Sequence, residues 1–170
     1  MSINIRIAQP KDASLLRRLA FNIYPAHFKH TWFSEREMDA YLESEFSLSS
    51  LNFRLKDPGV CWFIAETDKP VGFAKFTWIN TIPETAVSGV SLDRLYLAPD
   101  ATGKQFGRIF FKKIISIAQK KGMTFLWLQV REQNCRARQF YEVAGMRHIK
   151  DAFFRTESQV CRPHIMGMDI

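Results

Sequence analysis

Cysteine is scarce in this 170-residue sequence, and long apolar runs are missing from it. Its three cysteines, Cys61, Cys135 and Cys161, are odd in number and widely spaced, which argues against a disulfide framework and predicts a reducing, cytoplasmic location. No apolar run approaches the ~18 residues of a membrane span, and residues 1–12 contain no secretory h-region. No membrane partner is therefore expected. No cysteines or histidines are spaced as in a zinc site, so no metal is expected either.

Negative charge is scarce in the last part of the chain. Residues 101–170 hold 13 Lys and Arg against 5 Asp and Glu, whereas residues 1–100 hold 11 against 12. A basic half can bind nucleic acid, but no aromatic–basic module accompanies it. An anionic cofactor with several phosphate charges explains the asymmetry at least as well. Nucleic acid is therefore kept only as an alternative partner, whose binding would weaken steeply with salt.

The hydrophobic periodicity predicts a run of helices in the N-terminal part. Asp12 is expected to cap a helix that Pro25 ends, because proline cannot continue a helix. Ser34 and Glu37 have the spacing of a capping box at the start of a second helix. A short third helix is expected over residues 48–56.

Strands dominate the rest of the chain, where the apolar period changes to two. The predicted strands cover residues 4–8, 60–66, 71–78, 90–97, 125–130, 146–154 and 164–170. Helices ended by Gly122 and Gly145 are expected on either side of the strand at 125–130. The order βααβββαβαββ predicts a single α/β (α+β) domain over residues 1–170, with a mixed, mostly antiparallel sheet, flanking helices and one parallel crossover.

A glycine-containing loop joins the strand at 90–97 to the following helix. Backbone N–H groups at a helix N-terminus, together with the positive end of the helix dipole, suit a pyrophosphate. The residues expected to contact such a group are Thr102, Gly103, Lys104, Gln105, Phe106, Gly107 and Arg108. Gln105 is expected to keep a negative φ and to point its side chain away from the phosphates.

The next strand is followed, at Asn134, by a helix with one polar face. Helical spacing places Ala137, Arg138 and Tyr141 on the same face as Asn134, while Phe140 points toward a core. One face can therefore carry chemistry while the other anchors the helix.

This helix with its Phe140-Tyr141 pair, the apolar strand before it and the glycine-containing loop resemble the second half of an acetyl-CoA-dependent N-acetyltransferase of the GNAT superfamily. The resemblance implies the GNAT fold and acetyl-CoA as co-substrate. The family's loop follows a Gln/Arg-x-x-Gly-x-Gly/Ala pattern, from which this chain departs at Thr102 and Gln105. The resemblance also implies that the two parallel strands beside the cofactor splay apart. It adds as cofactor contacts Leu95, Tyr96, Leu97, Asn134, Ala137 and Tyr141.

The resemblance makes Tyr141 the general acid. A phenol with a pKa of ~10 can protonate a leaving thiolate, whose conjugate thiol has a pKa near ~8.5. Asp93 on the predicted central strand is a candidate base, although a salt bridge with Arg94 or with a lysine on a helix would explain it equally well. His27, His30 and His164 are further candidates for the base.

Motifs in the first hundred residues resemble the polyamine N-acetyltransferase branch of this family. They include Val71-Gly72-Phe73-Ala74-Lys75 and Arg94-Leu95-Tyr96-Leu97. The resemblance implies a small-molecule amine, such as a polyamine, as acceptor. Five carboxylates within residues 35–45 would attract an amine cation. Arg162-Pro163-His164 departs from that branch, which carries an acidic residue before its last strand.

Other functions stay open on the sequence. One is a non-catalytic, acetyl-CoA-binding regulatory module, which Thr102 and Gln105 favour and an intact Tyr141 disfavours. Another is acetylation of a protein N-terminus or of a small amino compound other than a polyamine. A homodimer is compatible with the sequence.

Overall fold

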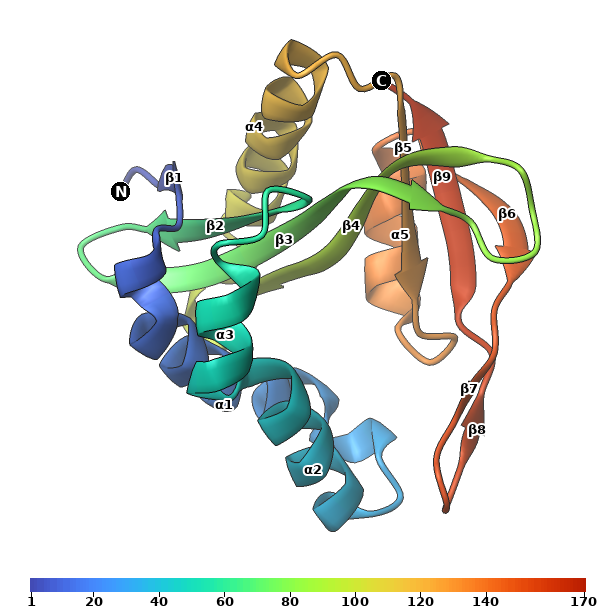
Figure 1. The fold of residues 1–170 in the computed structure, drawn as a ribbon, viewed down its shortest axis with the longest axis horizontal. Helices are drawn as coiled ribbons and strands as arrows, with labels where there is room; N and C mark the ends of the chain where they lie inside the picture. Colours follow the sequence, from blue (N-terminus) through green and yellow to red (C-terminus); the bar gives the residue numbers. More distant parts are fainter.

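The computed structural model describes residues 1–170 and consists of a seven-stranded sheet with helices on both faces (Figure 1). The helices are α1 (Ala13–Phe28), α2 (Glu35–Phe46), α3 (Leu48–Arg54), α4 (Phe106–Lys120) and α5 (Cys135–Val143). The strands are β1 (Asn4–Ile7), β2 (Val60–Glu66), β3 (Pro70–Thr81), β4 (Ser88–Leu97), β5 (Phe125–Val130), β6 (Arg147–Asp151), β7 (Phe154–Arg155), β8 (Val160–Cys161) and β9 (His164–Asp169). None of the helices combines the length and the apolar character needed to cross a membrane.

The sheet has the strand order β1-β2-β3-β4-β5-β9-β6, with β7 and β8 forming a separate hairpin. Only β4 and β5 run parallel, so the predicted mixed, mostly antiparallel sheet with one parallel crossover is confirmed. These two strands pair at Val90–Leu126 and Ser91–Trp127 and nowhere else. Beyond Ser91 they diverge, which leaves a gap at the centre of the sheet (Figure 1).

Alternation along the strands builds two cores, one on each face of the sheet. On β2, Phe63 and Ala65 pack into the cluster beneath α4 and α5, whereas Trp62 and Ile64 pack into the cluster beneath α1, α2 and α3. All four residues are almost fully buried. A strand covered on both faces is apolar at nearly every position, which explains the continuous apolar run of residues 60–65.

Two predictions about helix ends are wrong. Pro25 does not end α1, which continues to Phe28, and the carbonyl of Pro25 accepts a bond from Lys29 N–H. The ring packing of Tyr24 on Phe28, 4.8 Å between centroids, helps to hold this last turn despite the missing proline N–H. Asp12 occupies the cap position, but its carboxylate bonds to Arg6 instead of to the helix.

The other deviations involve contacts between distant parts of the chain. Ser34 caps α2 as predicted, accepting from Glu37 N–H at 3.3 Å. Glu37 does not close the capping box, because its carboxylate accepts from Thr156 and Ser158 in the β7–β8 hairpin. The strand predicted over residues 146–154 is interrupted, since β6 ends at Asp151 and the chain then turns into that hairpin.

Candidate active site

A cavity of about 550 Å³ opens at the end of β4, beyond the residues that pair with β5. Its walls come from the end of α1, the last residues of β4, the loop before α4 and the first turns of α5. The predicted cofactor-binding residues that line it are Leu95, Tyr96, Leu97, Thr102, Gly103, Gln105, Gly107, Arg108, Asn134, Ala137 and Tyr141. Two predicted residues do not line it: Lys104 is exposed to solvent, and Phe106 is buried in the core.

The loop before α4 presents a row of backbone N–H groups without acceptors. Ile109 is the first residue of the helix whose N–H donates within it, to Gln105 O at 3.1 Å. The six preceding amides, those of residues 103–108, donate to no acceptor in the protein. Arg108 and Arg136, which also line the cavity, add positive charge. Free amides, a helix N-terminus and two guanidinium groups together fit a pyrophosphate-bearing ligand.

Gln105 adopts a left-handed conformation, with φ of 61°, so the expectation of a negative φ is wrong. Gln105 immediately precedes α4, so this left-handed residue forms the turn between the loop and the helix. Glycine adopts such a φ without steric cost, which explains why the family pattern has glycine at this position. Gln105 also lines the cavity.

We therefore expect Gln105→Gly to raise the free energy of unfolding by up to about 1.5 kcal/mol. A left-handed L-residue costs roughly 1–2 kcal/mol, and the greater freedom of glycine in the unfolded chain cancels about 0.5–1 kcal/mol of the gain. Equilibrium denaturation measures the difference. Gln105→Ala is the control, because it removes the side chain and keeps the Cβ. A glycine variant no more stable than the alanine variant would contradict backbone strain at this position.

The cavity-facing edge of β4 has no neighbouring strand. Leu95, Tyr96 and Leu97 pair with β3 on one side, and no strand pairs with them on the other. Gly72 of β3 makes the close approach possible, because a Cβ there would lie 2.4 Å from Tyr96 O. On the cavity side, His27 Nε2 donates to Leu97 O at 2.7 Å. The open edge can accommodate an extended ligand chain, as the resemblance implied for the pantetheine arm.

Tyr141 lines the cavity, and its ring packs on Phe111 and Phe140 at centroid distances of 5.6 and 5.2 Å. Only 9% of the residue is exposed, and this burial raises the pKa of Tyr141 far above its ordinary value. The phenol therefore stays protonated at neutral pH. Its hydroxyl makes no hydrogen bond within the protein and is free to donate to a ligand.

Asn134 serves the helix and the cavity together. Its side-chain oxygen accepts from Ala137 N–H at 3.1 Å and caps α5, while the residue also lines the cavity. The side-chain NH₂ group remains for a ligand or for water.

A second cavity, of about 310 Å³, contains Asp93. Tyr96 lines both cavities, whereas Asp93 and Tyr141 lie in different ones. Asp93 is an extra residue on β4, because Lys75 pairs with Arg94 and Phe76 with Leu92. Such a bulge re-aims a side chain relative to the regular alternation.

Three donors surround the Asp93 carboxylate. Ser91 and Thr77 donate hydroxyl hydrogen bonds of 2.7 and 2.6 Å, and Lys75 Nζ lies 3.4 Å away. A carboxylate offers about four acceptor positions, so one remains for an acceptor amine or a water molecule. The carboxylate thus forms a salt bridge, but with Lys75 of β3 and not with either of the predicted partners, since Arg94 pairs with Glu45.

The acidic helix α2 is mostly neutralised by partners within the protein. Glu35 pairs with Lys29, Glu43 with Arg17, and Glu45 with both Arg54 and Arg94. Glu37 is occupied by the β7–β8 hairpin. These carboxylates therefore attract an amine cation less than the sequence suggested.

Sequence reasoning missed part of the cavity wall. The lining residues that were not predicted as cofactor contacts are His27, Phe28, His30, Thr31, Gln133, Arg136 and Phe140. Of these, His27 and His30 were predicted only as candidate bases. The basic residues flanking Asn134 were a usable signal for Arg136, since the cofactor was expected to be anionic.

The sequence model of the acetyltransferase (GNAT) family matches residues 21–146. The chain therefore belongs to the GNAT acetyltransferase family, and the predicted GNAT fold is confirmed.

Particular relatives agree with this assignment. The ribosomal protein bS18-alanine N-acetyltransferase of Haemophilus influenzae is 31% identical over 86 residues, which are 51% of this chain and 53% of that protein. The chain thus spans about half the length of this curated relative.

Two solved structures share the fold. The PaiA N-acetyltransferase from Thermoplasma acidophilum, in complex with coenzyme A, aligns over 100% of both chains with a TM-score of 0.80 and 23% identity. The ribosomal-protein-S18-alanine N-acetyltransferase from Escherichia coli aligns over 99% of this chain and 94% of its own, with a TM-score of 0.67 and 18% identity. At these identities the likeness concerns the fold alone.

Proposed function

We propose that the protein transfers the acetyl group of acetyl-CoA to a primary amine. The observation that carries this proposal is the cavity at the end of β4, which is lined both by the loop with the free amides and by Tyr141. A second cavity adjoins it at Tyr96 and supplies a separate place for the acceptor. A cytoplasmic location belongs to the same proposal, since all three cysteines are free thiols.

In the proposed mechanism the chain positions the two substrates. It also takes a proton from the acceptor amine and gives a proton to the leaving sulfur. The amides of residues 103–108 hold the pyrophosphate, and the open edge of β4 holds the arm that carries the thioester. A backbone N–H of that edge polarises the thioester carbonyl. The neutral amine nitrogen forms the new C–N bond as the C–S bond breaks, and Tyr141 gives its proton to the departing sulfur. The nitrogen then loses its second proton to water, and water reprotonates the Tyr141 phenolate.

The base in this proposal is Asp93. The acceptor arrives as an ammonium ion and must lose a proton before it attacks. Asp93 lines the cavity assigned to the acceptor and keeps one acceptor position free. His30 is the alternative on the cofactor side, because it lines the larger cavity. His164 lines neither cavity.

Two acceptor classes compete. The resemblance of the first hundred residues to the polyamine branch supports a polyamine. The Haemophilus influenzae relative, named for a ribosomal-protein alanine, supports a protein N-terminus. Arg131 lines the acceptor cavity and pairs with no carboxylate, so it would repel a polycation and accommodate peptide carbonyl groups, whereas the charge of Arg94 is balanced by Glu45.

A panel of acceptors assayed for CoA release decides between these classes. The panel contains spermidine, putrescine, a peptide with a free N-terminal alanine and the same peptide with an acetylated N-terminus. We expect turnover on an amine and none on the acetylated control. Spermidine as the best substrate identifies a polyamine enzyme, and the free peptide identifies a protein N-acetyltransferase. Acetyl-CoA binding without turnover on any amine would support the non-catalytic module instead.

A further inference from the structure

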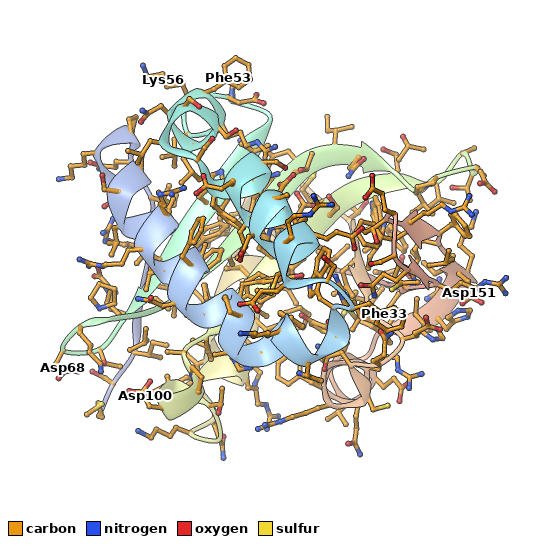
Figure 2. All side chains as sticks on the ribbon, turned by 90° about the horizontal axis from the view of Figure 1, so that it is seen from below. Phe33, Phe53, Lys56, Asp68, Asp100 and Asp151 are labelled. Atoms are coloured by element: carbon orange, nitrogen blue, oxygen red, sulfur yellow. The ribbon has the colours of Figure 1, made fainter.

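Three potential metal ligands meet on one side of the C-terminal strands, away from both cavities. His148 Nε2 lies 2.8 Å from Asp151 Oδ1, and His164 Nδ1 lies 3.4 Å from the same oxygen. All three ligand atoms lie within 4.8 Å of one another. Asp151 lies at the margin of the molecule, so the group is open to solvent (Figure 2).

A bulge in the edge strand β6 creates this arrangement. Residues three apart on a regular strand point to opposite faces, so His148 and Asp151 would be separated. Here His148 pairs with Met166, Lys150 with Ile165 and Asp151 with His164, which leaves Ile149 as an extra residue. Residues directly opposite each other share a face. The inserted residue therefore returns Asp151 to the face of His148, and His164 lies directly across from it.

The opposite face of the same strands packs against an apolar cluster. Ile149 and Ile165 belong to the cluster around Trp127 and Ile82, and a Cβ on Gly167 would lie 2.6 Å from Ile149 Cδ1. The small residue at 167 makes room for the bulged isoleucine. The position of the bulge is thus fixed by the core, and the His–Asp–His group on the other face is fixed with it.

We propose that His148, Asp151 and His164 bind a first-row divalent transition ion, with zinc as the reference. Two imidazoles and one carboxylate are ligands of this class of metal and disfavour magnesium and calcium. Ligands of one tetrahedral zinc stand about 3.3 Å apart, given Zn–N bonds of ~2.0–2.1 Å. Small side-chain rotations bring the three atoms to that spacing. Water completes the coordination, because the site is exposed.

Bound metal ties the edge strand β6 to β9, which lies between β5 and β6 in the sheet. A ligand that binds only the folded state raises its stability by mass action. The site touches neither cavity, so this proposal stands independently of acetyl transfer.

The test is titration of the purified full chain with zinc chloride in a calorimeter, together with the melting temperature at each zinc concentration. We expect one zinc ion per chain, a rise in melting temperature and no heat with magnesium chloride. His148→Ala and Asp151→Ala remove half-exposed side chains and are expected to fold. Each should weaken zinc binding by at least roughly tenfold, since even outer-shell partners of metal ligands are worth that much.

Two control variants isolate the site. Lys150→Ala changes the same strand on its other face, and Cys135→Ser removes the one exposed thiol. Both should keep the parental zinc affinity. No binding to the parent protein at 100-fold molar excess of zinc would overturn the proposal. Binding that survives both His148→Ala and Asp151→Ala would overturn it equally, because the ion would then lie elsewhere.

Discussion

Tyr141→Phe is expected to lower turnover by roughly 10²–10⁴-fold, the usual worth of a positioned general acid. The ring keeps its packing between Phe111 and Phe140, and only the hydroxyl is lost. The loss should appear in both kcat and kcat/KM, because the proton moves only in the transition state. Affinity for acetyl-CoA should stay close to that of the parent.

Burial raises the pKa of Tyr141, which by itself makes the phenol a weaker acid. The departing thiolate forms in the same desolvated place, and desolvation also makes that anion more basic. Transfer depends on the difference between the two pKa values, which therefore changes less than either one.

Tyr24→Phe is the matched control for this variant. Tyr24 is also buried, and its hydroxyl accepts from Trp32 Nε1 and from Arg131, but it lines neither cavity. Its loss should lower the free energy of unfolding by about 1 kcal/mol. Turnover should fall far less than in Tyr141→Phe, because Arg131 keeps its bond to Thr31 Oγ1. Near-parental turnover of Tyr141→Phe on a good amine substrate would remove Tyr141 from the mechanism.

Gly107→Glu is expected to abolish the rise in melting temperature that millimolar acetyl-CoA produces in the parent protein. Gly107 lies in the first turn of α4 and lines the cavity, among amides that donate to no protein acceptor. A carboxylate there would compete for those amides and repel the phosphates. Thermal melting with and without acetyl-CoA measures the effect.

Gly107→Ala separates charge from size. A Cβ at this position would lie 3.7 Å from Leu97 Cδ1 and 3.8 Å from Phe140 Cε2, which are ordinary contacts. The alanine variant should therefore fold and bind acetyl-CoA nearly as the parent does. If a folded Gly107→Glu variant binds acetyl-CoA as well as the parent does, the phosphates must bind elsewhere. If acetyl-CoA does not shift the melting curve of the parent protein, acetyl-CoA is ruled out as the co-substrate.

The features that were predictable from the sequence are those that local patterns determine. Period-two alternation and turn residues located the strands of the sheet, and the spacing from Asn134 placed Tyr141 on the cavity side of α5. The loop before α4 was recognisable because a helix N-terminus with glycines has a local signature.

The errors arose where distant residues decide a local outcome. Pro25 is a helix breaker by local rules, yet packing carries α1 three residues past it and brings His27 to the end of β4. Glu37 has the spacing of a capping box, but the β7–β8 hairpin offers it better donors. The proximity of His148 and Asp151 was not predictable either, because the two residues share a face only through a bulge, which sequence spacing does not indicate.

The divergence of β4 and β5 divides the sheet into two blocks, β1-β2-β3-β4 and β5-β9-β6. Backbone pairing joins these blocks at two residue pairs only, and the core beneath α4 and α5, which contains side chains of both blocks, supplies the rest of the connection. A linear ligand that contacts both blocks would strengthen this connection. The affinity for such a ligand and the rigidity of the sheet between β4 and β5 would then be linked. A substitution that weakens the contact between the two blocks would lower both.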